Sequence, residues 1–173
     1  AFEAISTDED LNDSIRVQLM QLIARAIGPE GMVAGQVLDM KNEGQQVGGE
    51  ALAEMHNRKT GDLIATSILA GACIAGATIE EQQCLATFGY ELGLAFQIRD
   101  DLLDVIGTTE QLGKPQGSDE AQDKSTFTSI YGLEGAEAQL NEVRDRALAA
   151  LKPLDNKAQS LVALTHFVVD RIH

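Results

Sequence analysis

Three aspartates lie close together in an otherwise apolar stretch of this 173-residue chain: Asp100, Asp101 and Asp104. Together with Gln97 they have the spacing i, i+3, i+4 and i+7, which places all four side chains on one face of a helix. Like charges four residues apart destabilise a helix by roughly 0.2–0.5 kcal/mol, which a bound cation would offset. Mg²⁺ is typically held by one or two carboxylates together with a substrate's phosphates. The pattern predicts a Mg²⁺ site, with Mn²⁺ as an alternative ion, and a solvated acidic face is the competing interpretation.

Other side chains that could bind an anion or support a metal site lie beside glycines or in turns elsewhere in the chain. They are Gln36 and Asp39 after Gly35, Lys59 and Thr60 before Gly61, Lys114 after Gly113, and Lys124 before Ser125. Each of them alone is better explained as an ordinary helix-end or loop residue. A lysine ammonium is a compact point charge that suits phosphate oxygens. The lysines are therefore candidates for binding a phosphorylated ligand.

The charge balance decides how such a ligand would be held. Acidic residues number 27 against 13 basic ones, which gives a net charge of −14. A field of this sign repels anions. We therefore expect a phosphorylated ligand to need a local group of lysines or metal ions, and we expect no nucleic-acid partner.

The two cysteines and the longest uncharged stretch indicate the surroundings of the protein. Cys73 and Cys84 have neither metal-site nor disulfide spacing, which favours a reducing, cytoplasmic compartment. The uncharged residues from Leu63 to Ile79 are too few, and too rich in small and polar side chains, for a stable membrane span. We interpret them as a buried helix.

Apolar periodicity predicts that helices carry the candidate residues. Residues 1–5 have a helical pattern, and an N-cap at Thr7–Asp10 should start a helix that ends at Gly28 and Pro29. Further helices are expected over about 31–41, 49–58, 79–105, 125–150 and 156–172. We expect a bend at residues 59–61, a surface loop over 107–123 and an interruption at Gly132. No strand alternation, repeat or linker is visible, so residues 1–173 should form one all-α domain.

Taken in order, the candidate segments resemble the trans-prenyl diphosphate synthases, most closely the bacterial farnesyl diphosphate synthase group. The matching segments are GQVLDM, HNRKTGDLI, FGYELGLAFQIRDDLLDVIG, LGKPQGSD and DKSTFTSIYGLEGA. They lie within residues 30–137. Five motifs in the family's order are far more specific than any one of them.

The resemblance implies which residues bind metal and diphosphate. The family's second aspartate-rich motif corresponds to Asp100, Asp101 and Asp104, and its first aspartate is the direct Mg²⁺ ligand. Lys59 and Lys114 correspond to the lysines that bind the allylic diphosphate. Gln36 and Asp39 correspond to a motif near the metal site.

The resemblance also implies a catalytic group and a departure from the family. Lys59, Thr60 and Gln97 correspond to the catalytic polar residues, and the last two face the bond that breaks. Lys124 corresponds to a substrate-binding lysine that usually follows glycine, whereas here it follows Asp123. Released diphosphate is the expected proton acceptor, so no histidine base is required and His56 is expected to be structural.

The implied fold is an isoprenoid-synthase-type helical bundle around a central cavity. The implied reaction condenses isopentenyl diphosphate with dimethylallyl or geranyl diphosphate to give farnesyl diphosphate, through Mg²⁺-assisted ionisation. A longer product such as geranylgeranyl diphosphate is the alternative. The complete enzyme is expected to be a homodimer.

The first aspartate-rich motif of the family does not occur in this chain, because no DDxxD and no Arg-Arg pair precede Gly35. We therefore expect residues 1–173 to be the C-terminal portion of a single synthase domain, with the N-terminal helices missing and this portion alone inactive. A truncated noncatalytic subunit and a related terpene cyclase are the alternatives. The KTG and LGK motifs favour the synthase over the cyclase.

Overall fold

The computed structural model describes residues 1–107 and 124–172. Its helices are α1 (Phe2–Thr7), α2 (Asp13–Ile27), α3 (Met32–Asn42), α4 (Gly49–His56), the π-helix η1 (Asn57–Gly61), α5 (Asp62–Ile74), α6 (Ile79–Ile106), α8 (Phe127–Leu151), the 3-10 helix η3 (Lys152–Ala158) and α9 (Gln159–Asp170). This described part contains no strand, which confirms the predicted all-α class. None of its helices is both long and apolar enough to span a membrane.

Most predicted helices are present. The uncharged stretch predicted as one buried helix over 63–79 is helical only to Ile74, and Leu63 and Ile74 are exposed.

The predicted start of the first long helix is wrong. Thr7 ends α1, and its hydroxyl donates a hydrogen bond to the carbonyl oxygen of Glu3 at 2.8 Å. Asn12 caps α2 instead, because its side-chain oxygen accepts a hydrogen bond from the amide of Ile15 at 3.0 Å. Thr7–Asp10 and Asn12 are both good N-cap candidates, so the capping preferences of single residues do not determine where α2 begins.

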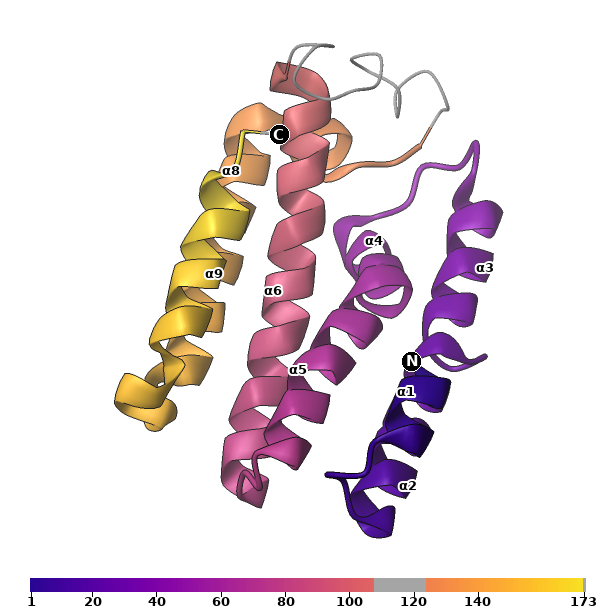
Figure 1. The fold of residues 1–173 in the computed structure, drawn as a ribbon. Helices are drawn as coiled ribbons and strands as arrows, with labels where there is room; N and C mark the ends of the chain where they lie inside the picture. The colour runs from indigo at the N-terminus through magenta and orange to yellow at the C-terminus, as the bar shows by residue number, and fades with distance from the viewer. Residues whose placement is uncertain (108–123, 173) are drawn as a thin grey trace.

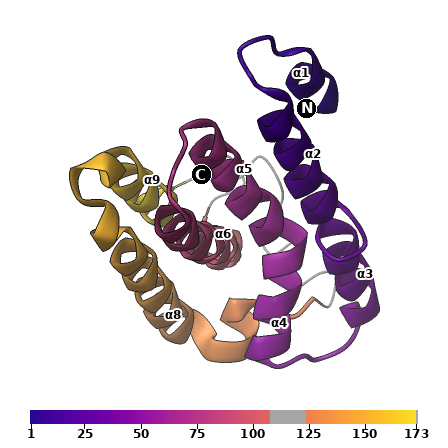
Figure 2. The same cartoon turned by 90° about the horizontal axis from the view of Figure 1, so that it is seen from below.

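The long helix α6 lies in the middle of the fold. It packs mainly against α8 and α5 and also contacts α4, α9 and η1. In Figures 1 and 2, α8 and α9 lie on one side of α6, α4 and α5 lie on the other, and α2 and α3 form the outer edge. Because other helices surround α6, its buried apolar side chains are not confined to one narrow stripe.

Two buried clusters hold α6 in place. Towards its N-terminal half, Phe88 and Leu92 pack with residues of α8, η3 and α9, namely Ala147, Leu151, Leu154, Ala158 and Val168. Further along α6, Leu94, Ile98 and Leu102 pack with residues of α4, α8 and α9, which include Leu52, Met55, Phe127, Leu140 and Val169. These contacts determine the rotation of α6 and hence where its polar residues point.

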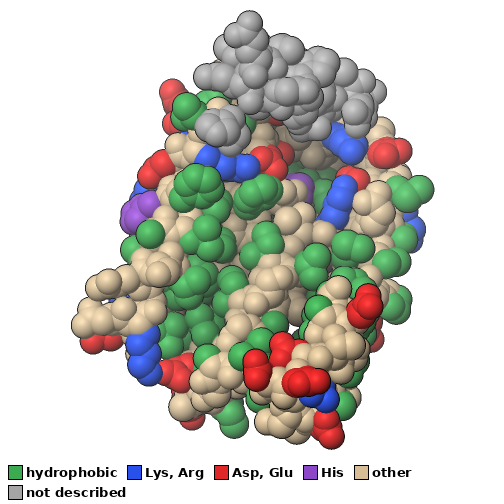
Figure 3. All heavy atoms as spheres, viewed as in Figure 1, with side chains coloured by type: hydrophobic (Ala, Val, Ile, Leu, Met, Phe, Trp, Pro, Cys, Tyr) green, Lys and Arg blue, Asp and Glu red, His purple; other side chains and the backbone are tan. Residues whose placement is uncertain are grey.

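One face of the molecule carries much exposed apolar surface. Figure 3 shows apolar side chains gathered over the middle of this face and acidic side chains at its lower end. On α3, the side chains of Val33, Val37 and Met40 follow one another at helical spacing and are 46%, 45% and 62% exposed. The described part of the chain therefore leaves an apolar stripe of α3 uncovered.

Candidate functional site

Lys59 and Thr60 lie in the π-helix η1, which joins α4 to α5 without a break. The predicted bend is thus a local widening of one helix turn, and such turns occur frequently at functional sites. The backbone of α3 touches η1, since a Cβ atom on Gly35 would lie 2.2 Å from the amide nitrogen of Lys59. On the other side, a Cβ atom on Gly93 of α6 would lie 2.8 Å from the Cα atom of Gly61. Two glycines therefore let α3 and α6 hold η1 between them.

Two of the predicted lysines meet at one carboxylate. The Nζ atom of Lys59 lies 2.7 Å from Oδ2 of Asp39, and the Nζ atom of Lys124 lies 3.8 Å from the same oxygen. Asp39 is buried, whereas the side chains of Lys59 and Lys124 are 34% and 28% exposed. Three separate segments, namely α3, η1 and the residues just before α8, thus build a lysine cluster of two ammonium groups and one carboxylate.

The lysine cluster is the local positive group that an anionic ligand would need in a protein of net charge −14. One buried carboxylate orients both ammonium groups but neutralises only one of them. Diphosphate oxygens would therefore find a net positive and partly exposed site. Lys114, the other predicted diphosphate-binding lysine, lies outside the described residues.

The three aspartates of α6 have different surroundings. The side chain of Asp100 is 45% exposed and accepts hydrogen bonds from the guanidinium of Arg171 and from Nε2 of Gln97, the latter at 3.4 Å. Asp101 is buried, and its Oδ2 atom accepts a hydrogen bond from the amide of Phe127 at 2.7 Å. Asp104 is also buried. Only the first of the three therefore presents its carboxylate at the surface.

Asp100 is suited to bind Mg²⁺, because its carboxylate already pairs with a positively charged group. The guanidinium of Arg171 already lies on its Oδ1 atom, so this oxygen faces a cation. In the part of the chain that is described, no three Asp, Glu, His or Cys side chains form a metal-binding cluster. Mg²⁺ commonly takes only one or two protein carboxylates and completes its shell with water and phosphates. Asp101 accepts a hydrogen bond from the first amide of α8, whose N-cap is Thr126 and where a negative charge is favourable. Its role as a metal ligand stays a prediction.

Sequence reasoning missed Arg171. Its guanidinium lies 3.9 Å above the ring of Phe96 and also donates a hydrogen bond to the carbonyl oxygen of Phe96 at 3.1 Å. The Arg99 side chain in turn donates two hydrogen bonds to the carbonyl oxygen of Arg171 at 2.9 and 2.6 Å. Arg171 and Asp100 are 71 positions apart, and no short-range pattern connects them.

His56 is buried between the lysine cluster and α8. Its ring stacks on Phe127 with the centroids 6.0 Å apart and an interplanar angle of 21°. Burial lowers the pKa of His56 from 6.5 to about 4, and the charge of Lys59 acts in the same direction. Neither ring nitrogen has a hydrogen-bond partner among the described residues. Leaving such a group unpaired typically costs about 1–3 kcal/mol.

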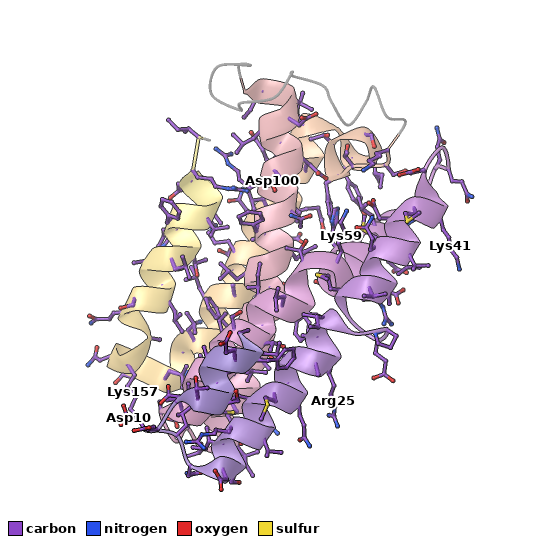
Figure 4. The ribbon with its side chains drawn as sticks, turned by 45° about the vertical axis from the view of Figure 1, so that its right-hand side comes forward. Asp10, Arg25, Lys41, Lys59, Asp100 and Lys157 are labelled. Atoms are coloured by element: carbon purple, nitrogen blue, oxygen red, sulfur yellow. The ribbon has the colours of Figure 1, made fainter. Side chains whose placement is uncertain are left out.

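The remaining predicted residues lie nearby or at the surface. Thr60 and Gln97 are half-buried, and Gln36 is exposed on α3. Figure 4 shows Lys59 and Asp100 toward one end of the molecule, whereas Asp10 and Lys157 lie at the other end. The structure therefore brings the lysine cluster and the acidic face of α6 to the same end of the helix bundle.

An open groove of about 560 Å³ lies on another side of η1. It is lined by Ala53, Asn57 and Arg58 together with the acidic residues Glu30, Glu50, Glu54 and Asp62. This lining repels a diphosphate, so the groove does not fit the predicted substrate. The central cavity implied by the family resemblance remains a prediction.

The family relationship is shown by comparison with known proteins. The model of the polyprenyl synthetase family matches residues 1–164. A farnesyl diphosphate synthase from Geobacillus stearothermophilus is 40% identical over 100% of this chain and 59% of its own length. A geranylgeranyl diphosphate synthase from Cyanophora paradoxa is 35% identical over 99% of this chain and 58% of its own length. The chain thus spans about three fifths of these relatives.

Solved structures agree with the sequence relationship. A geranyltransferase from Helicobacter pylori, complexed with magnesium and isoprenyl diphosphate, has a TM-score of 0.83 at 30% identity and matches 98% of this chain and 55% of its own. A geranylgeranyl pyrophosphate synthetase from Pyrococcus horikoshii has a TM-score of 0.84 at 27% identity and matches 98% of this chain and 63% of its own. From the family match, the close relatives and the shared fold we conclude that the chain belongs to the polyprenyl synthetase family.

Proposed function

We propose that the complete protein condenses isopentenyl diphosphate with dimethylallyl or geranyl diphosphate to give farnesyl diphosphate. The observation that carries this proposal is the lysine cluster of Lys59, Asp39 and Lys124, which lies at the same end of the bundle as Asp100. A diphosphate needs cations on more than one side before its C–O bond can ionise. The named relatives are prenyl diphosphate synthases, which supports the assignment.

In the proposed reaction, the residues of this chain bind and orient the allylic diphosphate. Lys59 and Lys124 move their ammonium groups from Asp39 onto the diphosphate oxygens. Asp100 and its water shell would hold Mg²⁺, which when bound neutralises charge on the leaving diphosphate. Asp101 keeps the adjacent turn of α6 attached to α8 through the amide of Phe127. The dipoles of Thr60 and Gln97 stabilise positive charge on the allylic carbon.

The proposed reaction needs no co-reactant besides the two diphosphates. The C–O bond of the allylic diphosphate breaks, and its electron pair leaves with diphosphate. The double bond of isopentenyl diphosphate then attacks the allylic cation, which forms the new C–C bond and moves the positive charge to the isopentenyl unit. A proton lost from the carbon next to that charge passes to the released diphosphate, and the electrons of the broken C–H bond restore a double bond. Buried apolar side chains around the site exclude water that would quench the cation.

The proposed product is farnesyl diphosphate, and a geranylgeranyl product is the alternative. Relatives of both kinds match this chain at 35–40% identity. We also propose that the complete enzyme works as a homodimer. The experiment is to incubate the complete protein with labelled isopentenyl diphosphate, each allylic diphosphate and Mg²⁺, and to separate the products by chain length. We expect a labelled C15 product. Failure to extend any allylic diphosphate would contradict the proposal.

A further inference from the structure

Ser125 is a polar residue next to Lys124 that the proposed reaction does not use. It lies between that lysine and Thr126, the N-cap of α8. Its hydroxyl donates a hydrogen bond to the carbonyl oxygen of Gln45 at 3.1 Å and accepts one from the amide of Val47 at 3.2 Å. A serine hydroxyl can donate and accept at the same time. One side chain therefore joins two backbone groups that are 80 and 78 positions away in the chain.

These two backbone groups belong to the connection between α3 and α4, residues 43–48. The connection follows directly after the helix that carries Asp39. The side chain of Val47 packs against the buried cluster that contains Leu94 and Ile98 of α6, so the connection is held in place from the inside. Figure 1 shows the segment before α8 running alongside this connection. The serine hydroxyl thus links that segment to a fixed part of the fold.

The start of α8 does not need these two hydrogen bonds. The hydroxyl of Thr126 accepts a hydrogen bond from the amide of Ser129 at 3.0 Å, which caps the helix. The amide of Phe127 donates to Asp101 at 2.7 Å. Neither contact involves the hydroxyl of Ser125. What its hydrogen bonds add is the position of the backbone before α8 relative to α3.

That position matters for Lys124. Its Nζ atom lies 3.8 Å from Oδ2 of Asp39, whereas the Nζ atom of Lys59 lies 2.7 Å from the same oxygen. The longer of these distances exceeds that of a hydrogen bond. An ion pair without a hydrogen bond does little to hold a side chain with as much conformational freedom as lysine. The location of this ammonium group therefore depends on its backbone, which the next residue links to the fold.

We propose that Ser125 is a positioning residue for diphosphate binding, which holds the backbone of Lys124 so that its ammonium group lies beside that of Lys59. This proposal rests on the proposed prenyl transfer, because Lys124 is the residue through which Ser125 acts. With the hydroxyl present, the segment before α8 is ordered when the protein folds. Without it, that ordering has to accompany binding and weakens the affinity for a diphosphate.

The binding test is calorimetric titration of the complete protein with inorganic diphosphate in the presence of Mg²⁺. We expect Ser125→Ala to weaken binding about fivefold, which corresponds to the net effect of one hydrogen bond. Ser125→Thr keeps a hydroxyl and should bind within about twofold of wild type. Ser67→Ala is the matched control and should leave the affinity unchanged, because the Ser67 hydroxyl also donates to a backbone carbonyl, that of Leu63 at 2.7 Å, but within α5.

A double-mutant cycle separates positioning from a general structural role. In a Lys124→Ala background, Ser125→Ala should change the diphosphate affinity by less than about twofold, because no ammonium group remains to be positioned. In steady-state kinetics, Ser125→Ala alone should raise the KM for the allylic diphosphate and change kcat by less than about twofold. An unchanged affinity in Ser125→Ala would overturn the proposal. So would losses that multiply independently in the double variant.

An NMR measurement tests the link without any ligand. In the complete ¹⁵N-labelled protein, we expect Ser125→Ala to speed hydrogen exchange at the amide of Val47 and to increase the mobility of the Lys124 amide in ¹⁵N relaxation. Ser67→Ala should change neither. Unchanged exchange and relaxation in Ser125→Ala would overturn the proposal even if the enzyme is active. A wild-type protein that forms no prenyl product but shows both changes would contradict the proposed function and leave the role of Ser125 supported.

Discussion

The lysines of this chain differ in whether they share a carboxylate with a second ammonium group. Lys59 and Lys124 share one buried carboxylate, whereas Lys157 at the other end of the molecule pairs with Glu81 and has a side chain that is 78% exposed. In the proposed enzyme, a diphosphate would displace Asp39 from Lys59 and Lys124, because both ammonium groups remain partly open to solvent. Lys157 also pairs with one carboxylate, but no second ammonium group of the described residues forms an ion pair with Glu81.

We expect Lys59→Ala to weaken the binding of inorganic diphosphate about tenfold or more, because a charge-assisted contact to phosphate is lost. Calorimetric titration of the complete protein in the presence of Mg²⁺ measures this change. Lys157→Ala is the matched control and should leave the affinity unchanged. Equal losses for the two variants would mean that net charge, and not the lysine cluster, governs binding.

Asp100 and Asp101 should respond differently to the same substitution. We expect Asp100→Ala to lower kcat about 100-fold or more and to raise the Mg²⁺ concentration needed for half-maximal rate, because it presents the exposed carboxylate. We expect Asp101→Ala to lower the free energy of unfolding by about 1–3 kcal/mol, because it leaves the amide of Phe127 unpaired. Steady-state kinetics and urea unfolding check the two effects. If Asp100→Ala needed the same Mg²⁺ concentration as wild type for half-maximal rate, Asp100 would not be a Mg²⁺ ligand.

The pKa of His56 predicts a pH dependence of stability. Its folded value of about 4 lies below the ordinary 6.5, because burial and Lys59 outweigh the opposing effects of Asp39 and Gln97. The unfolded chain therefore takes up a proton first as the pH falls below 6.5, and stability is lost down to about pH 4. Urea unfolding should show a loss of about 2 kcal/mol between pH 7 and pH 5 that His56→Phe lacks. Equal losses in the two proteins would show that other groups dominate.

At the scale of elements, the position of Lys59 depends on how closely α3 and α6 approach η1. A Cβ atom on Gly35 would meet backbone atoms, the nitrogen of Lys59 at 2.2 Å and its Cα at 2.5 Å. Backbone atoms cannot rotate away as the end of a side chain can. The close approach of α3 to η1 therefore determines the position of the lysine cluster.

We expect Gly35→Ala to destabilise the complete protein by about 1–3 kcal/mol and to weaken diphosphate binding, because α3 and η1 must separate. Gly71→Ala in α5 is the control, since a Cβ atom there has open space and should stabilise the helix by about 0.5–1 kcal/mol. Thermal unfolding and calorimetric titration measure the two effects. If Gly35→Ala were as stable and as active as wild type, η1 would not be held by this contact.

At the scale of the whole molecule, the chain is a helical assembly with an open apolar face. Val33, Val37 and Met40 form an exposed stripe on α3, and the chain spans about three fifths of its curated relatives. Exposed apolar stripes of this kind commonly mark surfaces that pack against other parts of a protein. In the proposed enzyme, this surface and the lysine cluster would both depend on residues outside the present chain.

We expect the 173 residues alone to show no prenyl transfer, because a diphosphate held on one side is neither fully neutralised nor positioned. They should also self-associate through exposed apolar surface, which sedimentation measures. Adding the complete protein's remaining helices should restore activity. Labelled prenyl product formed by the 173 residues alone would show that one aspartate-rich motif is sufficient.

The all-α class, most helix boundaries and the family were predictable from the amino-acid order, because helical periodicity and motif spacing are local. Asp100, Asp101 and Asp104 were predicted as one metal-binding group for the same reason: they share a helix face. The cap at Asn12 was missed because two neighbouring segments compete with similar local energies.

Only the tertiary structure separated those three aspartates, because the start of α8 supplies the amide that occupies Asp101. It also paired Lys59 and Lys124 with Asp39 and brought Arg171 onto Asp100. These contacts join residues distant in the chain, and their geometry depends on how α3, α6 and α8 pack. The amino-acid order therefore determined which chemical groups were available, and helix packing decided which of them meet.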